Sequence, residues 1–230
     1  IIILALHYTR LSWTTKKVNL LLGSYLFYAV WNPPFIILLW LSTLVDYFVG
    51  KKLYDEENKA KRKILLLISL LANLGMLGFF KYGGFLLDNF VAITSAVGID
   101  FHPAKPDIIL PVGISFYTFQ TLSYTLDMYK KKSAPEKSIL DFSLFVTFFP
   151  QLVAGPIVRP DQLLPQFKTP HYANREGMMT GLMLLSLGLF MKVVMADTFL
   201  SAPADMVFSS RDSLAAVDAW LGALAFSGQI

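Results

Sequence analysis

The sequence contains no cysteine, which excludes disulfide bonds, thiolate zinc sites and a cysteine nucleophile from these 230 residues. The motifs of serine hydrolases, P-loop proteins, dinucleotide-binding domains and H-E-x-x-H metalloproteases are also missing. Three histidines are present, His7, His102 and His171, at the ends of apolar runs or in loops. They lack the close spacing of metal ligands, so we predict no metal site.

Charged residues are scarce as well. Lys, Arg, Asp and Glu make up 16% of the chain, whereas a soluble domain usually has about a quarter. Hydrophobic residues make up 55%, and the mean hydropathy is +0.54. Residues 64–80 carry no charge, and residues 34–50 carry only Asp46. Because about 17 to 25 helical residues cross a bilayer core, we predict an all-α, polytopic transmembrane helical bundle rather than a soluble helical protein.

The apolar runs divide the chain into predicted membrane segments separated by polar loops. We expect spans at residues 18–31, 34–50, 64–80, 108–126, 139–153 and 177–200, a short interfacial or re-entrant helix at 84–98, the tail of a span at 1–6, a polar loop at 160–176 and a further span starting at 215. The chain begins without Met and closes inside an apolar run. We therefore expect residues 1–230 to be part of one membrane-embedded domain, truncated at both ends.

The basic residues are unevenly distributed among the loops. Residues 10–17, 51–63 and 130–137 hold 13 of the 20 Lys and Arg, whereas residues 81–107 hold two, Lys81 and Lys105. Short basic loops stay in the cytoplasm, so the first three segments are predicted to be cytoplasmic and 81–107 to face outward. This asymmetry explains the basic isoelectric point without nucleic acid as a partner.

The segment 108–126 is unusually polar for a membrane span. With successive residues 100° apart, its polar side chains cover about half of the helix, from Tyr117, Thr118, Gln120 and Thr121 to Tyr124, Thr125 and Asp127. Such a helix lies inside a bundle, where its polar groups find partners or water. Two interpretations stay open. In the first, the side chains form hydrogen bonds between helices. In the second, they line a polar tunnel, with Tyr117, Gln120, Tyr124 and Asp127 as the candidates. Asp127, like Asp46 and Asp88, is equally explicable as an interfacial residue.

The stretch FFPQLVAGPIVRP, residues 148–160, combines apolar side chains with three prolines. Pro150 is expected to end or kink the preceding helix, and Gly155-Pro156 makes a second break, so residues 151–155 are predicted to form a short re-entrant turn. Irregular backbone at membrane depth is tolerated where protein buries it or where it lines a cavity. Gln151 and Arg159 are therefore further tunnel candidates, since Arg suits phosphate or carboxylate groups. The alternative is an ordinary turn with Arg159 at the lipid headgroups.

Five blocks, in the order GSYLFYAVWNPPF, GFFKYGGF, LPVGISFYTFQTLSYTLDMY, FPQLVAGPIVRP and MKVVMADTF, resemble the membrane-bound O-acyltransferase family. The likeness runs through nearly all 230 residues and is strongest to the bacterial branch that contains the alginate O-acetyltransferase membrane subunit. It implies a helical bundle around a tunnel through the bilayer. An acyl donor enters from one side, a hydroxyl acceptor from the other, and a histidine in the tunnel acts as general base.

The resemblance further implies an O-acetyltransferase of the bacterial inner membrane that modifies an exported, alginate-like polysaccharide. Acetyl-CoA or an acyl carrier is expected on the cytoplasmic side as substrate, with no bound cofactor, and an extracytoplasmic polysaccharide-modifying acyltransferase is the expected partner. The family's histidine is expected beyond Ile230, so no catalytic residue is assigned here; some relatives carry His where Gln151 stands. The alternatives are D-alanyl transfer to teichoic acid, a transporter or channel, and an inert structural subunit.

Overall fold

The structure is a computed structural model that describes residues 3, 6, 9–99, 101, 103–104, 107–153, 155–170, 172, 174–210 and 215–230. All regular secondary structure in this described part is helical, which confirms the predicted fold class. The chain divides into two compact units, residues 1–170 and residues 171–230. The predicted tail of a span at residues 1–6 lies mostly outside the described residues.

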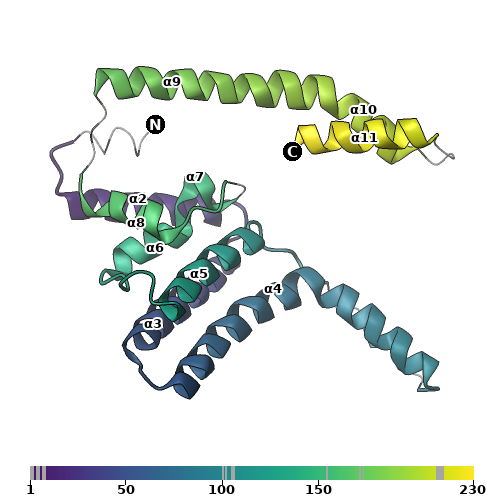
Figure 1. The fold of residues 1–230 in the computed structure, drawn as a ribbon, viewed down its shortest axis with the longest axis horizontal. Helices are drawn as coiled ribbons and strands as arrows, with labels where there is room; N and C mark the ends of the chain where they lie inside the picture. The colour runs from purple at the N-terminus through teal and green to yellow at the C-terminus, as the bar shows by residue number, and fades with distance from the viewer. Residues whose placement is uncertain are drawn as a thin grey trace. The chain divides into compact units, whose positions relative to one another are not determined.

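The first unit is built around three helices that lie side by side (Figure 1). Its elements are α2 (Trp13–Ala29), the short 3-10 helix η1 (Pro33–Phe35), α3 (Ile36–Asp55), α4 (Lys59–Ala96), α5 (Ile114–Tyr129), α6 (Ile139–Thr147), α7 (Phe149–Leu152) and α8 (Pro160–Lys168). α3 packs against α4 and α5, while α2 packs mainly against α6. The aromatic core lies where α5 meets α6, and the ring centroids of Tyr124 and Phe142 are 4.6 Å apart.

Two helices extend into the charged segment that the sequence predicted to be a loop at residues 51–63. α3 continues to Asp55 and α4 begins at Lys59, so only three residues connect them. The Asn58 side chain accepts hydrogen bonds from the backbone N–H groups of Ala60 (2.9 Å) and Lys61 (3.3 Å), which caps α4. Lys, Glu and Arg are good helix formers, and their charges ended the apolar runs without ending the helices.

α4 joins two segments that were predicted to be separate, the span at 64–80 and the short helix at 84–98. Its 38 residues correspond to about 57 Å of helix, nearly twice the thickness of a bilayer core. Figure 1 shows α4 bent along its length, and the adjacent Gly83 and Gly84 are the pair in its sequence best suited to permit a bend.

The predicted spans at 108–126 and 139–153 are both shorter helices in the structure. α5 begins only at Ile114, because Gly113 has a positive φ of 74° and interrupts the preceding backbone. α6 ends at Thr147, and Pro150 lies in the first turn of the separate helix α7. The prediction that Pro150 ends the preceding helix is correct, whereas the prediction of one span through Val153 is wrong.

The segment predicted to be a polar loop at 160–176 contains the amphipathic helix α8. Pro160 occupies its first position, where the missing N–H costs nothing. Leu163, Leu164 and Phe167 are buried on one side, and the ring of Phe167 contacts that of Phe148 at a centroid distance of 5.8 Å. The segment has few apolar residues overall, so hydropathy did not reveal this helix. Its apolar residues nevertheless recur at helical spacing and form one buried face.

The second unit consists of helices that continue one another. α9 (Arg175–Leu189) runs into η2 (Phe190–Leu200), which has π-type hydrogen bonding, and then into α10 (Ser201–Ser209). α11 (Ala216–Gln229) packs against α10 and η2. The predicted span at 177–200 is therefore part of a longer apolar helix.

Three helical stretches in the described residues are long and apolar enough to cross a membrane: Pro33–Asp55, Lys59–Ala96 and Arg175–Ser209. Most of their side chains are not buried inside the protein, and in the last stretch only Ala196 and Ala204 are buried. Apolar helices with exposed Leu, Phe and Met side chains require a lipid environment, so this is a membrane protein.

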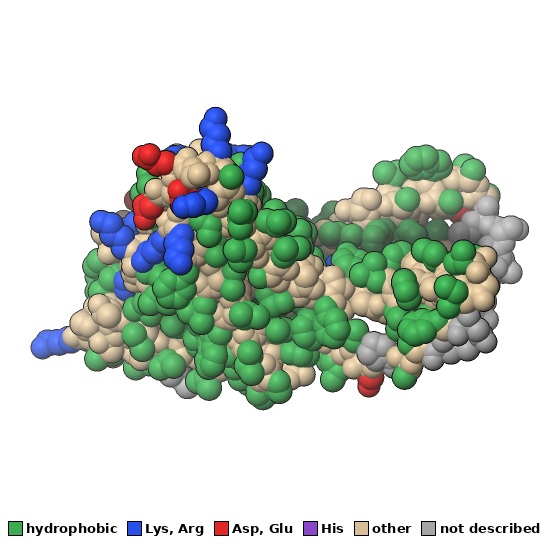
Figure 2. Space-filling view, turned by 90° about the horizontal axis from the view of Figure 1, so that it is seen from below, with side chains coloured by type: hydrophobic (Ala, Val, Ile, Leu, Met, Phe, Trp, Pro, Cys, Tyr) green, Lys and Arg blue, Asp and Glu red, His purple; other side chains and the backbone are tan. Residues whose placement is uncertain are grey.

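The predicted cytoplasmic segments meet at one end of the first unit. The Lys17 ammonium pairs with Asp141 at the start of α6 (2.5 Å), and the Tyr47 hydroxyl of α3 donates to the carbonyl of Lys137 (2.7 Å). Arg62 joins the ends of two helices there, because its guanidinium donates to the carbonyls of Leu53 and Tyr129. Figure 2 shows Lys, Arg, Asp and Glu side chains gathered in one region, with hydrophobic side chains over most of the remaining face.

We expect this charged end to be cytoplasmic. In the full-length protein with all native cysteines removed, single cysteines at Asp55 or Ser133 should react with a membrane-impermeant thiol reagent only from the cytoplasmic side. A cysteine at Ser95, beyond the bend of α4, should react only from outside; Lys105, in the predicted outward loop, lies outside the described residues. Labelling of Ser95→Cys from the cytoplasmic side would refute this orientation.

Candidate functional site

A buried carboxylate, Asp46, connects the three central helices. Its Oδ2 accepts a hydrogen bond from the Asn73 amide of α4 (2.7 Å), and its Oδ1 accepts one from the Thr125 hydroxyl of α5 (3.1 Å) and another from the Ser69 hydroxyl. All four side chains are fully buried. Three donors on one carboxylate therefore tie α3, α4 and α5 together.

The network continues from Asn73. Its side-chain carbonyl accepts hydrogen bonds from the Ser42 hydroxyl of α3 (2.7 Å) and the Thr121 hydroxyl of α5 (3.3 Å), and its amide also donates to the Ser69 backbone carbonyl (3.0 Å). We call Ser42, Asp46, Ser69, Asn73, Thr121 and Thr125 the polar kernel. Its closed pattern of partners favours the hydrogen-bond interpretation for this side of α5.

The sequence leaves Asp46 explicable as an interfacial residue near the end of a span. The structure corrects this, because α3 continues nine residues further, to Asp55. A sequence signal was available, since each of the three helices carries a pair of polar residues four positions apart: Ser42 and Asp46, Ser69 and Asn73, and Thr121 and Thr125. Residues at this spacing lie on one face of a helix.

Three of the predicted tunnel residues on α5 are buried: Tyr117, Gln120 and Tyr124. The Tyr124 hydroxyl accepts a hydrogen bond from the Glu136 backbone N–H (3.1 Å), which fixes the loop between α5 and α6. Tyr124 also packs closely on α3, since a Cβ atom added at Gly50 would lie 2.6 Å from its Cε1. Tyr124 thus stands between the helical core and the charged end.

Gln120 and Gln151 meet at one backbone carbonyl, that of Phe145. The Gln120 amide donates to this oxygen from α5, and the Gln151 amide donates to it from α7 (3.2 Å). The carbonyl is available because the N–H of Phe149, its usual partner four residues on, donates to the Ser24 hydroxyl instead (3.3 Å). Two predicted tunnel residues therefore stabilise the break between α6 and α7, and neither faces solvent.

The other two predicted tunnel residues lie elsewhere. Asp127 is half-buried near the end of α5, and its carboxylate lies 3.8 Å from the Lys132 ammonium. Arg159 is exposed immediately before α8, and no described residue forms a hydrogen bond or ion pair with its guanidinium. Arg159 is the one candidate of the six whose charged group is available to a ligand.

A cavity of about 300 Å³ lies beside Tyr124 and the start of α8, and an adjoining one of about 420 Å³ lies beside Lys17 and Asp141. Both are lined by Ala134, Glu136 and Lys168, and we call them together the charged groove. The Lys168 ammonium pairs with Glu136 Oε2 (3.2 Å), while Glu136 Oε1 accepts the backbone N–H groups of Lys137 (2.9 Å) and Ser138 (3.2 Å). The ion pair lies where the two cavities adjoin.

An apolar cavity of about 280 Å³ lies near the uncharged turn after α2. It is lined by Phe27, Tyr28, Val30, Trp31, Val112 and Val153. The Tyr28 hydroxyl in this lining donates to the Val112 carbonyl (3.0 Å). The cavity can take an apolar group and offers no chemistry for a reaction.

No group of His, Cys, Asp and Glu in the described part of the chain could hold a metal ion. The three histidines, His7, His102 and His171, lie outside the described residues. The described side chains therefore supply binding and structural groups, and they include no imidazole to act as a general base.

The chain is similar to curated bacterial O-acetyltransferases. A peptidoglycan O-acetyltransferase of Helicobacter pylori is 36% identical over 93% of this chain and 44% of its own length. A protein of Pseudomonas putida named a probable alginate O-acetylase AlgI is 35% identical over 94% of this chain and 44% of its own length, and the one of Pseudomonas aeruginosa is 36% identical over 94% and 41%. No family model matches the chain, and no solved structure matches it with significance.

The chain thus spans less than half the length of the curated relatives that it matches. The alignments nevertheless cover 93–94% of this chain. This chain is a homologue of these bacterial O-acetyltransferases, as its resemblance to the membrane-bound O-acyltransferase family predicted.

Proposed function

We propose that this chain belongs to an O-acetyltransferase of the bacterial inner membrane that transfers acetyl groups to hydroxyls of an exported polysaccharide. The observation that carries the proposal is the identity of about 35% to proteins named for O-acetylation, sustained over 93–94% of the chain. The relatives are named for two polymers, peptidoglycan and alginate, so the acceptor class is an exported polysaccharide.

The acyl donor, acetyl-CoA or an acyl carrier, would approach the charged groove. This groove lies at the end where the basic segments meet, and Tyr124 connects it to the buried core. Arg159 stands exposed next to Pro160 and Asp161, which line the groove. A guanidinium there suits the phosphate groups that both kinds of donor carry.

The described residues would hold and orient the substrates, while the general base would come from outside these residues. Transfer to a hydroxyl needs a base within hydrogen-bond reach of the acceptor oxygen, and the family resemblance places a histidine in that role beyond Ile230. The polar kernel and the two glutamine amides on the Phe145 carbonyl would keep the helices rigid around the reacting groups. An extracytoplasmic polysaccharide-modifying acyltransferase would be its partner in the cell.

The test uses the full-length protein in membranes supplied with a radiolabelled acetyl donor and an oligosaccharide acceptor. We expect alkali-labile label on the acceptor. Label from D-alanine in place of acetate would instead favour the teichoic-acid alternative, and solute flux without any acylated product would favour a transporter.

Within this function, Arg159→Ala should reduce acetyl transfer about 10- to 150-fold without reducing the amount of folded protein. The reason is the loss of a charge-assisted hydrogen bond to the donor, worth about 1.5–3 kcal/mol, from a side chain with no described structural contact. Arg175→Ala, at an exposed position in the second unit, is the matched control. Equal transfer by both variants would assign Arg159 to the headgroup layer alone.

A further inference from the structure

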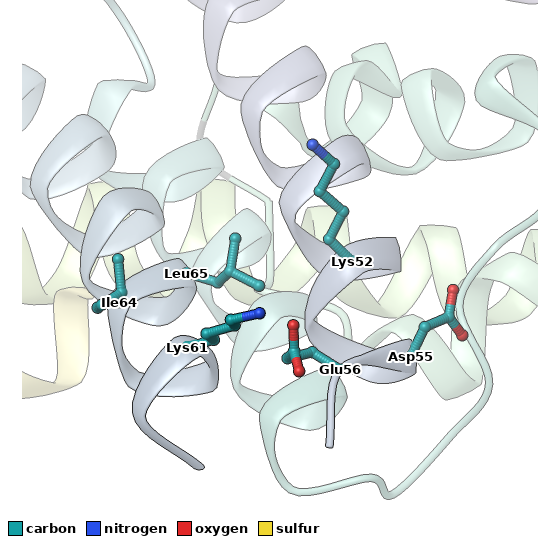
Figure 3. A pocket seen from close by; sticks show the side chains of 6 residues that line it. All are labelled: Lys52, Asp55, Glu56, Lys61, Ile64 and Leu65. Atoms are coloured by element: carbon teal, nitrogen blue, oxygen red, sulfur yellow. The ribbon is translucent and has the colours of Figure 1, made fainter. Parts of the chain in front are cut away.

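A cavity of about 500 Å³ opens between the end of α3 and the start of α4. It is lined by Lys52, Asp55, Glu56, Lys61, Ile64 and Leu65 (Figure 3). Two cations and two carboxylates form the polar part of the lining, and two aliphatic side chains form the apolar part. We call it the hairpin pocket, and it is separate from the charged groove.

The depth of the hairpin pocket in the membrane follows from α4. Ile64 begins the uncharged apolar run of this helix, and its side chain is 58% exposed, as expected for a residue that meets lipid. Lys61 precedes it by three residues, which is about 4.5 Å along the helix axis. The headgroup layer on each side of a bilayer is about 5–8 Å thick, so Lys61 and Glu56 lie within it.

The charged side chains of the hairpin pocket do not form ion pairs with one another. Figure 3 shows the Lys61 ammonium and the Glu56 carboxylate directed toward each other across the gap between the two helices, yet they form no ion pair. Glu56 Oε1 accepts only the backbone N–H of Asn58 (3.0 Å). No hydrogen bond or ion pair to another described residue holds the side chains of Lys52, Asp55 or Lys61. A bound group that carries both signs of charge would fit between Lys61 and Glu56.

We propose that the hairpin pocket binds a phospholipid whose headgroup carries a phosphate and a primary ammonium, as in phosphatidylethanolamine. The phosphate would pair with Lys61, with Lys52 adding positive potential, and the ammonium would donate to Glu56. The acyl chains would lie along Ile64 and the exposed lipid-facing side chains that follow it on α4, Leu67 and Leu71. This site is independent of the acetyl-transfer proposal.

The test measures lipid retained on the full-length protein by native mass spectrometry, after adding phosphatidylethanolamine, phosphatidylcholine or phosphatidylglycerol with identical acyl chains. Phosphatidylcholine has no N–H to donate to Glu56, and phosphatidylglycerol has the phosphate but no ammonium. We expect the ethanolamine lipid to be retained about two- to fivefold better than either, the range of an exposed ionic contact.

Two variants separate the contacts. Glu56→Gln should remove the preference for the ethanolamine lipid over phosphatidylglycerol, whereas Lys61→Gln should reduce retention of both by about two- to fivefold. Lys63→Gln, which removes an exposed charge of the same helix outside the pocket, should change neither. Equal retention of all three lipids by the wild type, or equal effects of Lys61→Gln and Lys63→Gln, would overturn the proposal in favour of unspecific annular lipid. Stronger retention of phosphatidylglycerol by the wild type would overturn it in favour of a plain phosphate site.

Discussion

Replacing Asp46 by Leu should lower the free energy of unfolding by about 2–5 kcal/mol. The change removes the acceptor for three hydrogen bonds, from Ser69, Asn73 and Thr125. Hydrogen bonds between membrane helices average about 0.6 kcal/mol and reach about 1.7 kcal/mol, so three of them give this range. Leu keeps the branch at Cγ, so it fills the site and leaves no cavity, although its methyl groups are bulkier than the carboxylate oxygens.

Asp46→Asn should cost much less, about 1 kcal/mol, because its amide still accepts one set of hydrogen bonds and hydroxyls can reverse their roles as donor and acceptor. Asp55→Leu is the matched control, since this exposed carboxylate belongs to the same helix and has no described partner. The unfolding of the full-length protein in detergent is monitored in two ways. One is its thermal melting curve, and the other is the loss of monomer in gel filtration after heating. If Asp46→Leu and Asp55→Leu melt at the same temperature, the polar kernel does not hold the three helices together.

The existence of the helices could be predicted from sequence, but several of their ends could not. Apolar runs of 17 to 24 residues identified α3, α4 and α9, because a chain in a bilayer must satisfy its backbone internally. Hydropathy, however, drops at the point where a helix leaves the lipid, which need not be the end of the helix. The helix itself ends at a cap such as Asn58 or at a backbone conformation such as that of Gly113. The predicted loop at 51–63 and the predicted span at 108–126 were wrong for this reason.

The sequence could predict which residues of α5 belong to the candidate site, but not which residues of the other helices they contact. The helical spacing of Thr121 and Thr125 marked one face of α5 as polar, and that face is buried. Their partners on α3 and α4 are set by tertiary packing, which one sequence does not contain. Likewise, Gln120 and Gln151 converge on the Phe145 carbonyl only because Phe149 donates to Ser24, a residue of α2 that is 125 positions away.

The break after α6 depends on Gly113, and Gly113→Ala should lower the free energy of unfolding by about 2–5 kcal/mol. Gly113 has a φ of 74°, a conformation that costs a residue with a Cβ about 1–2 kcal/mol. In addition, a Cβ here would lie 2.5 Å from the backbone carbonyl oxygen of Leu152 in α7. A backbone atom has no rotamer to change, so α5 and α7 must move apart, and overpacking of this kind costs about 1–3 kcal/mol more.

Gly98→Ala separates the two contributions. Gly98 has a φ of 82°, and an added Cβ would meet nothing within 4 Å, so this variant should lose only the conformational part, about 1–2 kcal/mol. Because α7 also carries Gln151, displacement of α7 in Gly113→Ala should pull the Gln151 amide away from the Phe145 carbonyl. Hydrogen exchange of residues 145–152 would report this as faster exchange in Gly113→Ala and unchanged exchange in Gly98→Ala. Equal stability losses with unchanged exchange in both variants would mean that the contact between Gly113 and Leu152 is not what positions α7.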